Sequence, residues 1–380
     1  MSAVLDTTGT AVVLPDVVEA AGCVLRTRDG RELLDLESGV WCTTLGHAHP
    51  AVAAALAGAS PAHVGYRWSS QVVPRAAQRL AGLCGLPDGR ALLLTSGSEA
   101  VELAVRIAAA VTGRAQFVRL GGHYLSAYGQ GGVPSDGRWR TSESLEALDE
   151  AALDSTLAGV AAFVIEPGNA SGMVRLPDAE RVRRLAARVR AAGGLVVADE
   201  VTTGFGRTGT WLGIEHLGVV PDVVALGKGC GNGYPVSAVV VSGAVAEAVA
   251  GSGLRYAQSH QNDPAGAAVV LAVADAVERE DLLRRSTERG AQLRAGLAGL
   301  AARTSAIRRV RGLGLMCAFD VAPGTALAVQ AGLLARGYLV GANALHDAVR
   351  VYPPLVISAE QVAAFLVVAG EVLGVTVPTT

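Results

Sequence analysis

Two stretches of the sequence, GGLVVADEVTTGFGRTG (193–209) and PDVVALGKGCGNG (221–233), each hold a short apolar run followed by charged and glycine residues. The first run ends at Asp199, and the second ends just before Lys228. Runs of this kind, rich in Val and Leu and separated by helical segments, recur at residues 91–95, 116–120, 159–165, 194–198, 222–226 and 236–242. Their length and composition are typical of parallel strands buried on both faces. The sequence therefore predicts an α/β fold with a mostly parallel sheet flanked by helices.

The pattern changes on either side of this α/β region. A chain of 380 residues is long enough for roughly two domains. Residues 26–36 predict a hairpin with a turn at Asp29-Gly30, and helical patterns dominate at residues 267–280, 289–302 and 361–373. We expect a large domain at residues 50–265 and a small α+β domain assembled from both termini, residues 1–49 and 266–380.

Composition and charge argue against several classes of protein. A net charge of −2, with arginines scattered along the chain, provides no electrostatic footprint for nucleic acid or an anionic membrane. No apolar stretch is long enough to span a bilayer, and the start MSAVLDTTGTAVVL lacks the basic region of a signal peptide. We therefore expect a cytoplasmic protein that binds neither nucleic acid nor membranes. The aromatic-basic patch Arg138-Trp139-Arg140 is interpreted as a surface loop.

The cysteines and histidines lack the spacing of disulfide frameworks and metal sites. An odd number of cysteines without a CxxC pair predicts free, buried thiols at Cys23, Cys42, Cys84, Cys230 and Cys317. Most histidines have no helical i, i+4 partner and are interpreted as loop or packing residues: His47, His49, His63, His216 and His346. We expect no metal site.

Lys228 is the only lysine in the sequence, and all other basic positions except the histidines are arginines. Arginine matches lysine in charge and in salt bridges, but its guanidinium does not form an imine at neutral pH. The single retained lysine, placed at the end of an apolar run, therefore indicates covalent chemistry at its amine. The alternative is that this lysine has no special role and was retained by chance while arginine replaced the other lysines.

The segment ALLLTSGSEAVELAVRIA (91–108) predicts a strand, a tight turn and a helix. Ser96 and Glu99 have the spacing of a capping box. The N–H groups of residues 97–99, with the Ser98 hydroxyl, would then be exposed at the helix N-terminus, which favours an anion such as phosphate. A G-x-S-x-G elbow and a GxxxxGK loop are both missing, which argues against a serine hydrolase and a P-loop.

The carboxyl ends of parallel strands meet at one edge of a sheet, so the helix N-terminus, Asp199 and Lys228 are expected to converge. Together they meet the requirements of pyridoxal 5′-phosphate (PLP): an anion site for the phosphate, an amine for a Schiff base, and a carboxylate that keeps the pyridine nitrogen protonated. At about 4 Å and an effective dielectric near 20, an Asp–pyridinium pair gains roughly 4 kcal/mol, enough to hold the ring protonated.

Several long motifs, in order and spacing, resemble the class III aminotransferases of PLP fold type I, which include ornithine and 4-aminobutyrate aminotransferases. The motifs are LLDLESGVWCTTLGHAHPAV (33–52), TSGSEAVELAVRIA (95–108), DEVTTGFGRTG (199–209), PDVVALGKGCGNGYPVSAV (221–239), RGLGL (311–315) and VRVYPPL (349–355). The resemblance covers nearly the whole chain. It implies a homodimer that binds PLP in a large domain with a seven-stranded sheet.

The resemblance also implies roles for individual residues. Lys228 would form the internal aldimine and shuttle the substrate proton, Asp199 would pair with the pyridine nitrogen, and Tyr124 would stack on the ring. Further cofactor contacts would come from Ser96, Gly97 and Ser98 at the phosphate, from Glu166 and Thr202 near the ring, and from Ser259 toward the neighbouring subunit's phosphate. Substrate contacts would come from Trp41, His260 and Arg350. Arg350 would bind a carboxylate, although an arginine before Pro-Pro-Leu is equally compatible with a structural role.

The chain departs from the family pattern close to the expected cofactor. Tyr124-Leu125-Ser126 stands where the family commonly has Tyr-His-Gly, and Thr202 stands where a glutamine contacts the ring hydroxyl. Lys228 and Asp199 are retained, so we expect an aminotransferase that moves an amino group from an amine or amino acid to a keto acid by a ping-pong mechanism. A racemase, epimerase or aminomutase on the same scaffold is the alternative, and a protein that binds a ligand without turnover is a third interpretation.

Overall fold

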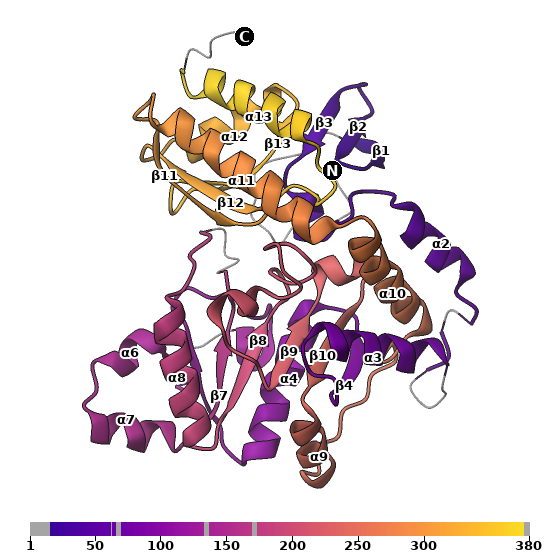
Figure 1. Cartoon of the computed structure of the whole chain (residues 1–380), viewed down its shortest axis with the longest axis vertical. Helices are drawn as coiled ribbons and strands as arrows, with labels where there is room; N and C mark the ends of the chain where they lie inside the picture. Colours follow the sequence, from indigo (N-terminus) through magenta and orange to yellow (C-terminus); the bar gives the residue numbers. More distant parts are fainter. Residues whose placement is uncertain (1–15, 62, 66–69, 133–136, 169–172, 376–380) are drawn as a thin grey trace, which may run out of the picture.

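A computed structural model describes residues 16–61, 63–65, 70–132, 137–168 and 173–375. Figure 1 shows an α/β part and a smaller α+β part above it, with helix α10 (Pro264–Arg279) between them. The expected lack of a signal peptide, which rests on residues 1–14, lies outside the described residues, as do the outermost ends of the expected small domain.

A seven-stranded sheet forms the centre of the α/β part. Its strands, in spatial order, are β4 (Arg90–Leu94), β10 (Ser237–Val241), β9 (Val223–Leu226), β8 (Leu195–Asp199), β7 (Val160–Ile165), β5 (Gln116–Arg119) and β6 (Trp139–Thr141). β10 runs antiparallel to both of its neighbours, and the strands from β9 to β6 pair in parallel. The apolar runs predicted as strands are therefore confirmed.

Within the large sheet, β6 is the strand that the sequence pattern missed. Trp139 is buried, and its ring stacks on Phe117 of β5 with 5.0 Å between the ring centroids. The interpretation of Arg138-Trp139-Arg140 as a surface loop is therefore wrong for the tryptophan. A strand of three residues, with an arginine at its centre, is too short to show the apolar pattern of the inner strands.

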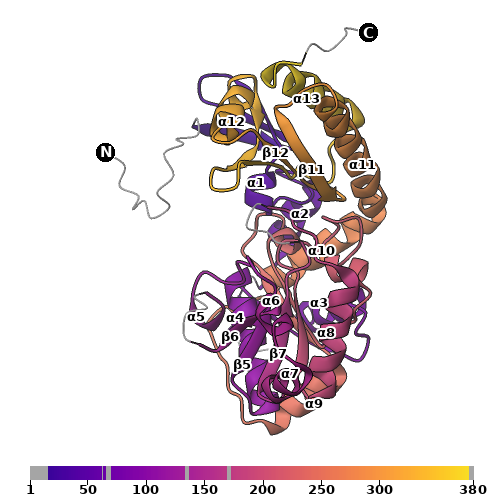
Figure 2. The same ribbon diagram turned by 90° about the vertical axis from the view of Figure 1, so that its left-hand side faces the viewer.

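Helices cover both faces of this sheet. In β8, Val196 and Ala198 pack in one core with α3 (Val72–Leu83) and α8 (Ala179–Ala191), whereas Val197 packs in a second core with α4 (Gly97–Thr112). Figure 2 shows α4 on one side of the sheet and α3 and α8 on the other. Because successive side chains point to opposite faces, a strand covered on both sides must be apolar where it is covered, as β8 is up to its last residue, Asp199.

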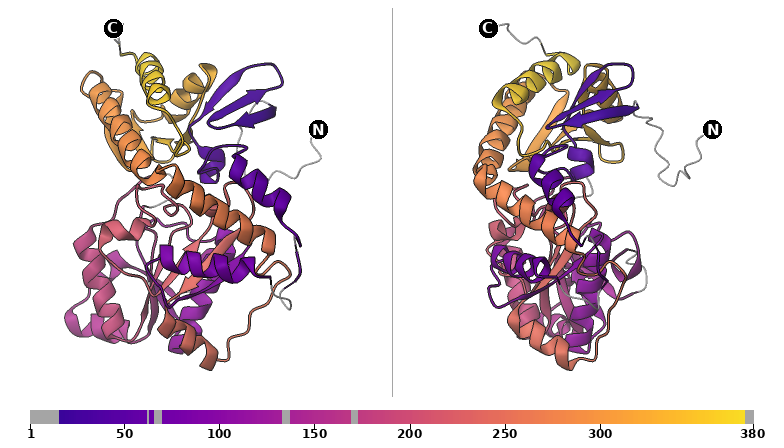
Figure 3. Two further views of the ribbon diagram at one scale, coloured as in Figure 1. Left: turned by 45° about the vertical axis from the view of Figure 1, so that its right-hand side comes forward. Right: turned by 90° about the vertical axis from the view of Figure 1, so that its right-hand side faces the viewer.

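The smaller part contains two four-stranded sheets. One comprises β1 (Val17–Ala21), β2 (Val24–Thr27), β3 (Glu32–Asp35) and β13 (Tyr338–Leu339), and the other comprises β11 (Ile307–Leu313), β12 (Met316–Val321), β15 (Ala348–Val351) and β14 (Gly341–Asn343). β13 pairs in parallel with β3, so the two ends of the chain meet in one sheet (Figure 3). The antiparallel β2–β3 pair confirms the predicted hairpin.

Helices α11 (Leu282–Ala301) and α12 (Ala326–Ala335) pack on these sheets, and α13 (Ala359–Val372) packs against both helices. Helices α10, α11 and α13 confirm the helices predicted after residue 266. The domain boundaries themselves stay a prediction, and α10 continues across the one at residue 265. The remaining helices are α1 (Ser38–Trp41), α2 (Pro50–Gly58), α5 (Gly129–Gly132), α6 (Ser142–Glu146), α7 (Glu150–Leu157) and α9 (Gly243–Gly251), with 3₁₀ turns η1 (Gly213–Leu217) and η2 (Lys228–Gly231).

Among the described residues, no helix is both long and apolar enough to cross a membrane. All five cysteines are free thiols, as predicted. Four of them are buried, and the prediction of a buried thiol is wrong for Cys42, which is half-buried.

Arg207 connects the two parts of the molecule. Its buried guanidinium donates hydrogen bonds to the carbonyl oxygens of Leu315 and Pro353, at 3.2 and 2.5 Å, and to Oγ of Ser38 at 3.2 Å. Burial lowers the pKa of Arg207 to about 10. Because these acceptors come from the smaller part of the fold, the arginine fixes the position of that part over the carboxyl edge of the large sheet.

Candidate active site

A pocket of about 390 Å³ lies where β4, β8 and β9 end and the smaller part begins. It brings together most of the predicted site residues: Trp41, Ser96, Gly97, Ser98, Tyr124, Glu166, Asp199, Thr202, Lys228 and Arg350. Val40, Leu125 and Val201 complete its lining. Two predicted residues, Ser259 and His260, do not line it. Side chains from positions far apart in the sequence therefore share one cavity, at the sheet edge where α/β proteins bind ligands.

Lys228 is the second residue after β9 and is held on two sides. Its Nζ donates a 2.8 Å hydrogen bond to Oγ1 of Thr202 and lies 5.0 Å from the ring centroid of Trp41. Burial lowers the pKa of Lys228, while the nearby acids Asp199 and Glu166 oppose that effect. The backbone of Lys228 has φ 43°, in the left-handed region that side chains rarely adopt. Such strain is typical of functional positions, because the surrounding fold must hold the residue there.

Asp199 is the last residue of β8 and pairs in register with Ala225 of the neighbouring strand β9. Its side chain is buried, and Oδ1 accepts the Val201 N–H at 3.1 Å. Burial raises the pKa of Asp199 well above its usual range, and the negative charge of Glu166 adds to the effect, while Lys228 opposes it. A carboxylate in these surroundings is stabilised by any further cation placed against it.

The N-terminus of α4 opens into the same pocket. Ser96 is the N-cap, and its Oγ accepts the Glu99 N–H at 3.2 Å, as predicted. The Glu99 carboxylate is turned away from the pocket, because it accepts hydrogen bonds from Thr95 and from the Tyr256 hydroxyl. The Ser98 Oγ accepts the Ala127 N–H at 2.9 Å, which leaves its own proton available to a ligand.

Two glycines let this helix end approach the strand edge. A Cβ on Gly97 would lie 2.5 Å from Cγ1 of Val201, and a Cβ on Gly227 would lie 3.1 Å from Cα of Gly97. Neither position therefore accommodates a side chain without a shift. The result is an anion site with bare backbone N–H groups directly beside the Lys228 turn.

Tyr124 and Glu166 line another wall of the pocket. The Tyr124 N–H donates to Oε2 of Glu166 at 3.4 Å, and the Glu166 N–H donates to Nδ1 of His123 at the same distance. Burial, together with the charge of Arg119, lowers the pKa of His123 to about 3, so this imidazole is neutral. The Tyr124 side chain is half exposed, and its aromatic surface is accessible to a planar ligand.

Trp41 and Arg350 come from the smaller part of the fold. The guanidinium carbon of Arg350 lies 5.0 Å from the Trp41 ring centroid, the same distance as the Lys228 ammonium. The indole therefore attracts both cations of the pocket. Tyr352 packs against the same indole, with the two ring centroids 5.3 Å apart.

Glu37, the partner of the pocket residue Arg350, is a residue that the sequence analysis missed. Its Oε2 lies 3.4 Å from Arg350, and Gly341 leaves room for the pair, because a Cβ there would lie 2.3 Å from Glu37 Oε1 and 2.5 Å from Arg350 Nε. Burial raises the pKa of Glu37 to about 7, although Arg350 opposes the effect. The two residues are 313 positions apart. The only signal was an acid inside the motif 33–52, with nothing to indicate its partner.

Ser259 and His260 lie away from this pocket, in the turn before α10. His260 lines a different cavity, of about 230 Å³, with Tyr234 and Asp263. Both Ser259 and His260 are exposed. Within a single chain, neither residue therefore reaches the candidate pocket.

These residues fit PLP. The α4 N-terminus with the bare Gly97 suits a phosphate, the Lys228 amine suits an aldehyde, and the buried Asp199 carboxylate is suited to a protonated ring nitrogen. A mostly parallel seven-stranded sheet with a smaller part built from both chain ends, carrying this site, defines the PLP-dependent enzymes of fold type I.

The chain belongs to the class III aminotransferase family, whose model matches residues 7–126 and 129–372. The chain is 34% identical to 5-aminovalerate aminotransferase DavT of Pseudomonas aeruginosa over 330 residues, which is 78% of this chain and 76% of the relative. It is also 34% identical to acetylornithine aminotransferase of Streptomyces coelicolor over 367 residues, covering 92% and 89%. The resemblance expected from the motifs is therefore confirmed.

Solved structures agree with this assignment. An amine transaminase from an uncultivated Pseudomonas species, determined in a PLP-bound form, is similar with a TM-score of 0.87 and 25% identity, over 98% of this chain and 99% of that chain. Acetylornithine aminotransferase from Elizabethkingia anophelis has a TM-score of 0.82 at 25% identity over 96% of both chains. The protein is a PLP-dependent enzyme that transfers amino groups, and nothing in these comparisons supports the racemase or aminomutase alternative.

Proposed function

We propose that this pocket performs amino transfer with Lys228 as the residue that holds the cofactor and moves the substrate proton. One observation carries this proposal: Lys228, Asp199 and the N-terminus of α4 all line the same cavity. When bound, PLP supplies an aldehyde that condenses with amines and a protonated ring that serves as an electron sink. The Asp199 carboxylate keeps the ring nitrogen protonated, and Ser96, Gly97 and Ser98 hold the phosphate.

The chain's own groups then handle the proton. With its pKa lowered by burial, Lys228 Nζ accepts the proton from the substrate Cα and later returns a proton. Thr202 accepts a hydrogen bond from Nζ and orients it, Tyr124 packs on the ring, and Glu166 lies beside Asp199. The low-dielectric pocket strengthens each of these interactions.

We propose that the substrates carry a carboxylate as well as the reacting amino or keto group. Arg350 faces the pocket and offers a planar fork for that carboxylate, above the indole wall of Trp41. Glu37 is the contact partner of Arg350 until a substrate carboxylate competes for it. The similar enzymes named for 5-aminovalerate and acetylornithine act, by their names, on amino acids, which supports a donor of this class.

A donor panel tests this proposal. Holoenzyme would be mixed with 5-aminovalerate, N-acetylornithine, 4-aminobutyrate, alanine or a simple alkylamine, with and without pyruvate or 2-oxoglutarate, and the amino acid formed would be measured. We expect turnover that needs the keto acid and favours a carboxylate-bearing donor. Arg350→Gln should raise KM for that donor at least about tenfold and leave the alkylamine unaffected. Loss of optical activity of a single amino acid without any keto acid would instead establish the racemase.

We also propose a homodimer in which Ser259 contributes to the neighbouring subunit's phosphate site. In one chain Ser259 is exposed and outside the pocket, which is the arrangement expected of a residue that acts in trans. Mixed refolding of Lys228→Ala with Ser259→Asp chains should recover up to about a quarter of the wild-type activity, because half of the dimers then hold one intact site. No recovery from two inactive parents would contradict a shared site.

We propose the cytoplasm as the compartment of this enzyme. The support is its five free thiols, which are typical of proteins in a reducing environment. Fractionation of the producing cells, followed by detection of the protein, tests this directly; recovery outside the cytoplasmic fraction would overturn it.

A further inference from the structure

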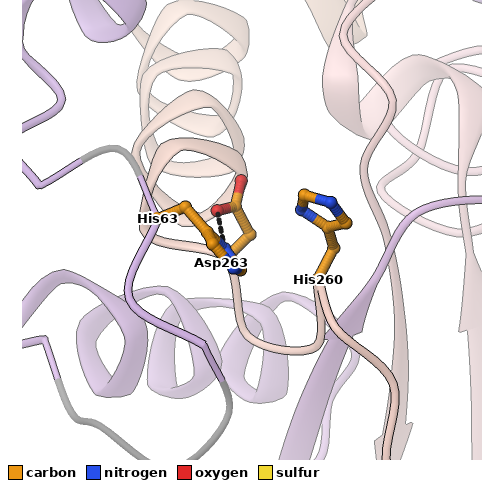
Figure 4. Close-up of side chains that lie close together, drawn as sticks. All are labelled: His63, His260 and Asp263. Carbon is orange, nitrogen blue, oxygen red and sulfur yellow. Dashed lines mark hydrogen bonds and ion pairs between the residues drawn. The ribbon is translucent and has the colours of Figure 1, made fainter.

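His63, His260 and Asp263 lie close together although they come from two distant regions of the chain. Their ligand atoms all lie within 4.8 Å of one another, and the two imidazole centroids are 4.7 Å apart. Figure 4 shows His63 paired with Asp263, with Nδ1 3.3 Å from Oδ1, and His260 standing beside this pair. None of the three lines the PLP pocket.

Asp263 is rigidly placed for a ligand role. It is the N-cap of the 16-residue helix α10, where Oδ2 accepts the Gly266 N–H at 3.2 Å. The same oxygen accepts the Tyr234 hydroxyl at 3.1 Å. Oδ1 is thereby directed toward His63, and hydrogen bonds of this kind to the second oxygen commonly orient a ligating carboxylate.

The turn that carries His260 is also anchored. Asn262 makes two hydrogen bonds with Leu93 of β4, one from its backbone N–H at 2.9 Å and one to its Oδ1 at 3.0 Å. The His260 N–H donates to Oε1 of Gln258 at 2.8 Å. Two of the three side chains therefore project from a fixed turn, and the exposed His63 is free to adjust its side-chain angles toward them.

We propose that His63, His260 and Asp263 form a binding site for a divalent transition metal of the Zn²⁺ type. Tetrahedral Zn²⁺ with bonds of about 2.0–2.1 Å requires ligand atoms about 3.4 Å apart. The His63–Asp263 distance already matches, and rotation of the exposed imidazoles closes the remaining gap. Three protein ligands leave a fourth position for water. Two imidazoles with a single carboxylate select Zn²⁺, Ni²⁺ or Co²⁺ over Mg²⁺ and Ca²⁺, which prefer oxygen ligands.

The predicted consequence is a metal cross-link between the segment before α3 and the start of α10. A ligand that binds only the folded chain raises its stability by mass action. We therefore expect Zn²⁺ to raise the melting temperature of the protein, and to do so only when both histidines are present.

Calorimetric titration of Zn²⁺ into chelator-treated holoenzyme, freed of excess cofactor, tests the site. We expect one Zn²⁺ per chain. His63→Ala and His260→Ala should each weaken binding at least about tenfold, and Asp263→Asn should do the same while keeping the helix cap, since asparagine caps as well as aspartate. His346→Ala, at another exposed histidine, is the matched control and should bind as the wild type does.

Two outcomes would overturn the proposal. The first is that the wild type binds no more Zn²⁺ than the His63→Ala/His260→Ala double variant. The cluster would then be only an ion pair with a neighbouring imidazole. Binding that survives in the double variant but disappears in Cys42→Ser places the metal at the half-buried thiol beside Lys228 instead. Thermal melting of every variant without metal, compared with wild type, separates lost binding from lost folding.

Discussion

Nζ of Lys228 lies 2.8 Å from Oγ1 of Thr202, a residue that follows β8 while the lysine follows β9. The family commonly has a longer glutamine where this chain has the threonine. The shorter, β-branched side chain thus contacts the catalytic amine directly in the free pocket. Branching at Cβ restricts χ1, so the hydroxyl has few alternative directions.

Replacing Thr202 by valine should weaken catalysis while preserving the fold, because valine keeps the shape and removes the acceptor. A hydrogen bond to a charged group contributes about 1.5–3 kcal/mol, so kcat should fall at least about tenfold. Thr202→Ser, which keeps the hydroxyl, should retain most activity. Steady-state kinetics and thermal melting of both variants decide the matter, and equal kcat for valine and serine would show that the hydroxyl does not position the amine.

Asp199→Asn should separate stability from activity. The buried carboxylate raises the free energy of the empty pocket, so the neutral, nearly isosteric amide should leave the stability of the cofactor-free protein unchanged or higher. Activity should fall by about three orders of magnitude, because the roughly 4 kcal/mol that holds the ring nitrogen protonated is lost. The measurements are kcat of the PLP-bound enzyme and the denaturant midpoint of the cofactor-free protein. Near-wild-type kcat would refute the assigned role of Asp199.

Glu37→Gln should flatten the dependence of stability on pH. Burial raises the pKa of Glu37 to about 7, so the native chain holds a proton that the unfolded chain has already released above its ordinary pKa near 4.5. The wild type therefore loses stability as the pH rises from about 4.5 to about 7, by about 3 kcal/mol from this residue. Urea unfolding of both proteins at pH 5 and pH 8 measures the difference. If the free energy of unfolding changes equally with pH in the wild type and in Glu37→Gln, then Glu37 is ionised throughout and its charge is fully compensated by Arg350.

Most strands of the large sheet were predictable, because the burial of each strand is visible in its own short sequence. A strand such as Val223–Leu226, buried on both faces, must be apolar at every position, and that pattern is visible in four residues. β6 was not predictable, because Trp139 is buried by stacking on Phe117 of the neighbouring strand, whereas Arg140 remains exposed. The pattern predicted a small domain assembled from both termini, but it did not predict the pairing of β3 with β13, because neither short strand shows which partner it will have.

The centre of the candidate site was predictable for a similar reason. Asp199 and Lys228 each follow a strand, and parallel strands end at the same edge, so chain position alone brings them together. Glu37 and the His63–His260–Asp263 cluster depend on contacts across most of the chain, and no spacing rule predicts such meetings.

The position of the covalent bond between protein and cofactor tests the role of Lys228. Wild type and Lys228→Arg, which keeps the charge but forms no imine, would be loaded with PLP, scanned for absorbance near about 410–430 nm, reduced with borohydride and mapped by peptide mass spectrometry. We predict a band and a reduced adduct on the peptide containing Lys228 in the wild type, and neither in the variant. An adduct on the N-terminal amine alone, or the same band in Lys228→Arg, would contradict the central claim that Lys228 is the amine of this enzyme.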